Sequence, residues 1–172
     1  MNEELRLYSF TNFYLSSIQQ GIQTGHAAVE LFNKYLISEG WQNGFAEQVN
    51  EWAANWKTFI CLNGGDASGV AGVERWMTDP VNPYAWTSFV ESDVSLNGIT
   101  TTVAIILPAR IFDTAALLRM RKLPDHVTYS IDHLLDEHRF TFADDFGGHT
   151  LETYNSWEIG MMKIMNSCGL AR

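Results

Sequence analysis

The chain has 172 residues, of which 46% are hydrophobic and 18% charged, so it can bury a core and is not disordered as a whole. Its net charge of −9 disfavours strong binding to a nucleic-acid backbone, which depends on Lys and Arg. We expect one domain, since roughly 100–200 residues is the usual domain size. No run of about 18 apolar residues and no signal-peptide pattern is present, so we expect a cytoplasmic protein without a membrane span.

The basic residues are unevenly distributed. Only 4 of the 11 precede Pro108, where they face 11 acidic residues. Four of the remaining bases fall in one short stretch: Arg110, Arg119, Arg121 and Lys122. We expect any anion-binding surface there, with solvated charge on a helix as the alternative. The two cysteines, Cys61 and Cys168, form no CxxC motif, which predicts free thiols in a reducing compartment.

The first part of the chain predicts a strand followed by a long helix. The aromatic segment Leu5–Leu15 is typical of a strand, and Ser16 and Ser17 offer side-chain oxygens that can cap a helix. In that helix, which Gly40 ends, a set of apolar or small residues recurs every three or four positions, the spacing of one buried face. This set is Ile18, Ile22, Gly25, Val29, Phe32 and Leu36.

The middle of the chain alternates between helix and strand. Its expected elements are helix Phe45–Trp56, strand Lys57–Leu62, helix Gly69–Met77, and strands Trp86–Val90 and Thr100–Leu107. The last two strands pair as a hairpin, because Asn97-Gly98 between them favours a tight turn.

After Pro108 the pattern is mostly helical. The expected helices are Ile111–Met120, Val127–His138 and Leu151–Met165, with a loop over Asp144–Gly148. The whole order, β-α-α-β-α-β-β and then helices, predicts an α/β fold with a four-stranded mixed sheet and helices on its faces. Residues 1–108 would form the core, and residues 109–172 a helical extension packed on it.

A polar row runs along the first helix beside its apolar residues. Gln19, Gln23, His26 and Glu30 are spaced by four, three and four positions, so their side chains are neighbours. A histidine within reach of a carboxylate suits proton transfer, although a structural hydrogen bond is the commoner role. Gly21 and Gly25 are costly inside a helix and predict the close approach of a backbone or ligand.

These residues resemble the opening helix of type II peptidyl-tRNA hydrolases, whose pattern runs roughly M-G-K-G-K-I-A-A-Q-x-[SG]-H-A. Gln23 matches the glutamine of that pattern, and Gly25-His26-Ala27 matches its last three positions. The second half of the pattern resembles Phe89–Asp93, then Asn97-Gly98, then Thr102–Pro108. The likeness covers about residues 5–108 and implies the same four-stranded sheet.

The resemblance implies hydrolysis of the ester between a peptide and the 3′ end of tRNA, without a metal or organic cofactor. A water would attack the carbonyl, deprotonated or positioned by His26 and by Glu91 or Asp93. Thr102 would complete this catalytic group and hold the substrate. Gln19, Gln23, Gly25 and Glu30 would line the substrate-binding groove. The family also implies a homodimer.

One departure from the family pattern bears on catalysis. The family's catalytic lysine corresponds to Gln19, which carries no charge and cannot transfer a proton. Three functions therefore remain open. The chain is a peptidyl-tRNA hydrolase, an inactive relative that binds a small nucleotide or tRNA end, or an acidic module that masks a protein partner, as small phage-encoded inhibitors do.

Other patterns carry less weight. His133 and Glu137 would share one face of a helix and bind an ion with an outside ligand, but a solvated helix edge is the simpler interpretation. The segment 63–69 is rich in glycine after a strand, yet it lacks the spacing of a phosphate-binding loop and indicates a turn. The last helix carries an apolar stripe, expected to pack on the core or meet a partner: Trp157, Gly160, Met161, Ile164 and Met165.

Overall fold

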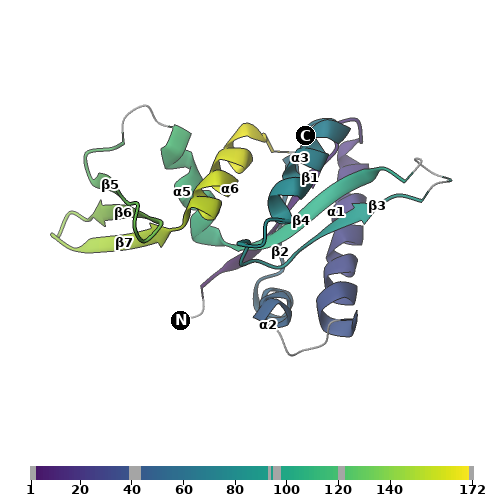
Figure 1. Cartoon of the computed structure of the whole chain (residues 1–172), viewed down its shortest axis with the longest axis horizontal. Helices are drawn as coiled ribbons and strands as arrows, with labels where there is room; N and C mark the ends of the chain where they lie inside the picture. The colour runs from purple at the N-terminus through teal and green to yellow at the C-terminus, as the bar shows by residue number, and fades with distance from the viewer. Residues whose placement is uncertain (1–2, 39–43, 93, 95–97, 120–122, 171–172) are drawn as a thin grey trace. The chain divides into compact units, whose positions relative to one another are not determined.

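The computed structural model describes residues 3–38, 44–92, 94, 98–119 and 123–170. The chain folds as two compact units, residues 1–110 with 168–172 and residues 111–167. The expected packing of the C-terminal segment on the core stays a prediction. Figure 1 shows the elements of both units.

The first unit is built on a four-stranded mixed sheet, as predicted (Figure 1). Its strands are β1 (Leu5–Thr11), β2 (Thr58–Asn63), β3 (Trp86–Val90) and β4 (Thr100–Pro108). They lie in the order β2-β1-β4-β3; β1 and β2 are parallel and the other pairs antiparallel. The predicted hairpin of β3 and β4 is confirmed, with an irregularity in register between Phe89 and Val90.

Helices cover both faces of this sheet. The alternation along β1 places Leu5 and Leu7 in the apolar cluster beneath α1 (Ser17–Phe32), together with Ala104 and Ile106 of β4. Tyr8 and Phe10, at the alternate positions of β1, are also buried, on the opposite face. There α3 (Ala67–Met77) packs against β1 and β4.

Two shorter helical segments complete the α1 side. Helix α1 continues as a π-helical segment, η1 (Asn33–Ser38), and α2 (Gly44–Glu51) continues as another, η2 (Trp52–Trp56). Val49 and Trp52 belong to the same apolar cluster as α1. The predicted helices over 45–56 and 69–77 are therefore confirmed within a few residues. Gly40 and Asn97, the expected helix stop and turn residue, lie outside the described residues.

Over most of its length, helix α1 buries the side opposite to the one predicted; of the predicted set, Phe32 and Leu36 pack against the apolar cluster. Ile18, Ile22 and Val29 are 77%, 52% and 57% exposed. The buried residues are instead Gln20, Gln23, Thr24, Ala27, Ala28 and Leu31. Alanines let the helix lie close to the sheet, and the polar side chains find partners there. Thr24, for example, shares a hydrogen bond of 2.7 Å with Ser9 of β1, which offsets the cost of burying its hydroxyl.

The second unit is not mostly helical, which corrects the prediction. Helix α5 (Ala109–Arg119) is confirmed, but the segment expected as the next helix forms β5 (Val127–Asp132) and the start of β6 (Glu137–Ala143). With β7 (His149–Tyr154) they make a three-stranded antiparallel sheet, followed by α6 (Ser156–Ser167).

Local chemistry explains this difference. The β-branched and aromatic residues of β5 favour a strand. A turn then connects β5 to β6. The Asp132 carboxylate stabilises this turn by accepting the N–H groups of Leu134 and Leu135, and Asp136 adopts the left-handed region at φ 53°. The loop over 144–148 is confirmed, since Asp144 accepts two backbone N–H groups of that turn. Trp157, Met161 and Met165 of the apolar stripe are buried.

Candidate functional site

The polar row of α1 begins with a helix cap. Ser16 precedes the helix, and its hydroxyl oxygen accepts the Gln19 N–H at 3.3 Å. In return, Gln19 Oε1 accepts both the N–H of Ser16, at 2.9 Å, and its hydroxyl, at 3.0 Å. Such a capping box satisfies groups that the helix end leaves unpaired. The structure therefore gives Gln19 a structural task, which the S-x-x-Q spacing could have revealed.

Gln23 connects α1 to the β3–β4 hairpin. Its side chain is buried, and its Nε2 donates to Glu91 Oε1 at 2.6 Å. Its Oε1 accepts the hydroxyl of Thr101, at the start of β4, at 3.0 Å. The amide thus links a carboxylate and a hydroxyl that lie far from it in the sequence. Thr101 was missed by the sequence analysis, although it stands beside the predicted Thr102.

His26 lies one turn beyond Gln23 on the same side of the helix. The imidazole is exposed and stacks on the ring of Phe89, with centroids 4.6 Å apart and planes 14° from parallel. Phe89 precedes Glu91 by two residues. The two halves of the predicted site, on the helix and on the hairpin, therefore meet at one place. We call His26, Gln23, Glu91, Phe89 and Thr101 the α1–hairpin cluster.

The other predicted site residues lie differently. Thr102 is fully buried in β4, paired in register with Phe89, and its hydroxyl has no hydrogen-bond partner among the described residues. Gly25 is exposed, and a Cβ there would meet nothing within 4 Å, so no part of the described chain makes the predicted close approach. Glu30 is half-buried one turn after His26. Asp93 lies outside the described residues.

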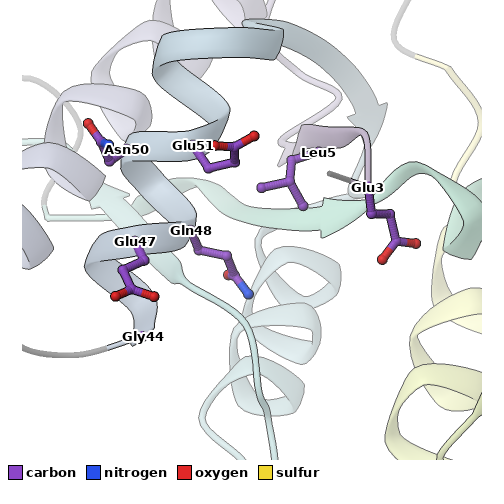
Figure 2. Close-up of a pocket in the computed structure, with 7 residues that line it drawn as sticks. All are labelled: Glu3, Leu5, Gly44, Glu47, Gln48, Asn50 and Glu51. Atoms are coloured by element: carbon purple, nitrogen blue, oxygen red, sulfur yellow. The ribbon is translucent and has the colours of Figure 1, made fainter. Parts of the chain in front are cut away.

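Two hollows of the first unit were not predicted. One, of about 530 Å³, is lined by Glu3, Leu5, Gly44, Glu47, Gln48, Asn50 and Glu51 (Figure 2). Its three carboxylates disfavour phosphate groups. The other, of about 340 Å³, includes Lys34 and Trp86 in its wall. There the Lys34 ammonium donates to the Trp86 carbonyl at 3.1 Å and lies 4.7 Å from its ring centroid, so this cation is already held by the fold.

The glycine-rich segment after β2 is a structural turn, as the sequence indicated. Gly64 lies so close to β1 that a Cβ would come within 3.1 Å of the Phe10 carbonyl carbon. Asp66 then caps α3, accepting the Gly69 N–H at 2.9 Å. Hydrogen bonds from the Ser68 hydroxyl and the Gly69 N–H hold the pKa of Asp66 below its ordinary value. A carboxylate thus occupies the helix end at which a phosphate would bind.

Two of the four basic residues expected to bind an anion, Arg110 and Arg119, contact other groups of the protein. Arg110 Nε lies 2.6 Å from a carboxylate oxygen of Glu3, and Arg119 donates to the carbonyl of Asn166 at 2.9 Å. Arg121 and Lys122 lie outside the described residues. Both cysteines are free, as predicted.

The predicted metal site at His133 and Glu137 is not formed, because the two residues do not lie on one helix. His133 lies in the turn after β5 and Glu137 in β6, where the Glu137 carboxylate accepts hydrogen bonds from Arg139. Across the described ranges, no group of three potential ligands could hold a metal ion. In the same part of the chain, the helices are too short or too polar to traverse a bilayer.

Comparison with known proteins assigns no family: no protein-family model and no curated protein matches the chain. The resemblance to type II peptidyl-tRNA hydrolases therefore stays a prediction, carried by the residues quoted for it.

Proposed function

We propose that this protein hydrolyses the ester that joins a peptide to the 3′ end of tRNA, using the α1–hairpin cluster. The observation that carries the proposal is the hydrogen bond from Gln23 to Glu91 beside the stack of His26 on Phe89. It brings a carboxylate to the side of the helix that carries an accessible imidazole, and both kinds of group can transfer a proton to or from an attacking water. The four-stranded mixed sheet is consistent with the fold that the resemblance implies.

In this scheme His26 acts as the general base. Its imidazole takes a proton from a water whose oxygen attacks the ester carbonyl, and later returns it to the leaving 3′ oxygen. The products are a peptide carboxylate and the free 3′ hydroxyl of the tRNA. The Glu91 carboxylate, held by Gln23, orients the water or the imidazolium that forms. Gln19 supplies no positive charge to the developing oxyanion, so we expect slow turnover.

A second candidate, binding of a tRNA end or small nucleotide without cleavage, is favoured by the capping role of Gln19. The position at which the family pattern has its lysine here stabilises the helix end. A third, a module that masks a basic protein surface, is favoured by the three carboxylates around the larger hollow (Figure 2).

The test is single-turnover cleavage of peptidyl-tRNA with the enzyme in excess. Wild type is compared with His26→Ala and with His133→Ala, which removes another exposed histidine far from the cluster in sequence. We expect His26→Ala to lower the rate by about 100-fold or more, as loss of a general base does, and His133→Ala to leave it unchanged. Binding without cleavage in wild type would favour the second candidate, and failure to bind tRNA or nucleotides would favour the third.

A further inference from the structure

The smaller hollow of the first unit contains two opposite charges that do not neutralise each other. Lys34 of η1 and Asp79, just after α3, both line it, yet neither forms an ion pair with any residue that the structure describes. The Lys34 ammonium donates one N–H group to the Trp86 carbonyl, and the rings of Trp86 and Tyr35 attract its charge without supplying an anion. Asp79 uses one carboxylate oxygen to accept the Val81 N–H, at 3.0 Å. The hollow therefore presents a cation and a carboxylate, each able to contact a ligand.

Aromatic and apolar side chains make up much of the remaining wall. Four of the ten lining residues are aromatic. Met77 and Tyr84 are buried, whereas Phe45 and Trp86 are half-buried. Ligand pockets usually combine such a wall with a few polar groups that fix the orientation of the ligand, and their volumes run from about 300 to about 1,000 Å³. At about 340 Å³ this hollow fits a small molecule with an apolar body.

We propose that this hollow binds a free α-amino acid with an aromatic or branched apolar side chain. The carboxylate of the amino acid accepts a hydrogen bond from the Lys34 ammonium, and its own ammonium donates to the Asp79 carboxylate. Its side chain lies against the aromatic wall, where rings attract one another in offset or edge-to-face arrangements. Each charge of the hollow thereby gains an opposite partner, and the attraction is stronger beside an apolar wall than in bulk water.

The balance of charge favours a zwitterion over other small ligands. A phosphate group carries about two negative charges at neutral pH, whereas the hollow offers one cation beside an acid, in a chain of net charge −9. A metal ion would need more ligands than Asp79, and the described residues contain no group of three that could hold one. No residue of the α1–hairpin cluster lines the hollow, so the proposal does not rest on the proposed hydrolysis.

NMR titration of the isotope-labelled full chain with L-phenylalanine and with L-leucine tests the proposal. We expect L-phenylalanine to bind with a Kd of about 0.01–1 mM, and glycine, which lacks the apolar body, to bind at least tenfold more weakly. Phenylalaninamide lacks the carboxylate and N-acetylphenylalanine lacks the ammonium, so each should also bind at least tenfold more weakly than L-phenylalanine. If neither L-phenylalanine nor L-leucine binds at concentrations up to about 5 mM, the proposal is overturned.

Two variants assign the charges of the ligand to their partners. Lys34→Met keeps an apolar stem against the rings but removes the ammonium. It should weaken L-phenylalanine at least tenfold and leave phenylalaninamide unchanged, because the amide has no carboxylate to lose. Asp79→Asn keeps an oxygen that can accept the Val81 N–H. It should weaken L-phenylalanine but not N-acetylphenylalanine.

The matched control for the lysine change is Lys57→Met. Lys57 is exposed, lies outside the hollow and, like Lys34, donates to a backbone carbonyl, that of Ala54 at 2.7 Å. This variant should bind L-phenylalanine as the wild type does. Equal weakening by Lys34→Met and Lys57→Met overturns the proposal. So does an equal loss of L-phenylalanine and phenylalaninamide in Lys34→Met, which is what a collapsed hollow would give.

Discussion

The buried side of α1 is more polar than its exposed side, which is the reverse of what side-chain hydrophobicity alone predicts. The buried side carries Gln20, Gln23 and Thr24 among alanines and Leu31, whereas the exposed side carries two isoleucines and a valine. Polar side chains can be buried when each finds a partner, and Thr24 and Gln23 do so with Ser9, Thr101 and Glu91. The contrast teaches that helical spacing identifies a stripe but not which stripe faces the core. It also separates what stabilises the fold from what remains accessible.

The largest expected effect on stability comes from truncating a side chain on the buried side of α1. Leu31 is fully buried in the apolar cluster, so Leu31→Ala should lower the free energy of unfolding by about 2–5 kcal/mol. Ile18→Ala, measured by urea unfolding at low protein concentration, should change it by less than about 0.5 kcal/mol. Equal losses from the two variants would mean that the exposed side is part of the core.

Gln23 provides the next largest effect. Gln23→Ala removes the hydrogen bonds that join α1 to Glu91 and Thr101, and should cost about 1–3 kcal/mol of unfolding free energy because the Thr101 hydroxyl is buried and would lose its partner. Hydrolysis should fall as well if Glu91 is held for catalysis. Urea unfolding and the single-turnover assay measure the two effects. Full stability after the change would show that the amide does not connect helix and hairpin.

Gln19→Lys tests whether residue 19 can serve catalysis as well as cap the helix. The change removes the two bonds that Gln19 Oε1 accepts, whereas Ser16 still accepts the backbone N–H of residue 19, so it should cost about 0.5–1 kcal/mol of unfolding free energy. The new ammonium should nevertheless increase single-turnover hydrolysis, because it stabilises the developing oxyanion. Gln19→Ala is the control that removes the same side-chain hydrogen bonds without adding charge. If hydrolysis rises no more in the lysine variant than in this control, a further catalytic element is missing.

The smallest expected effect is a gain. A Cβ at Gly21 would meet nothing within 4 Å, and alanine forms helix better than glycine. Gly21→Ala should therefore raise the free energy of unfolding by about 0.5–1 kcal/mol. Thermal unfolding at low protein concentration checks this. A loss of stability would show that the helix backbone meets something at this position.

Sequence patterns predicted the first unit better than the second. The strands of the four-stranded sheet are marked by β-branched runs and by glycines between elements, and these local signals agree with the tertiary fold. The region 127–154 failed because short apolar spacings fit helix and strand alike, while the turn made by Asp132 and Asp136 depends on their side-chain oxygens and on backbone conformation.

The candidate site was predictable in its residue types but not in its connections. The nearness of His26 to the segment that carries Glu91 was expected from the likeness of two short segments, and the structure shows it through the stack of His26 on Phe89. That Gln23 is the residue bonded to Glu91, and that Phe89 supports the imidazole, depends on which side of α1 faces the sheet. The spacing of apolar residues indicated the wrong side. Only the capping of Gln19 by Ser16 had a local signal that the sequence analysis overlooked.

The most direct test of the central claim is a comparison of cleavage rates for peptidyl-tRNA between wild type and His26→Gln, which keeps a polar side chain of similar size but cannot accept and return a proton. We predict measurable cleavage above the uncatalysed rate in wild type, and loss of that excess in His26→Gln with its free energy of unfolding unchanged. Cleavage that persists in the folded variant, or that is absent from wild type, would contradict the assignment of His26 as the general base.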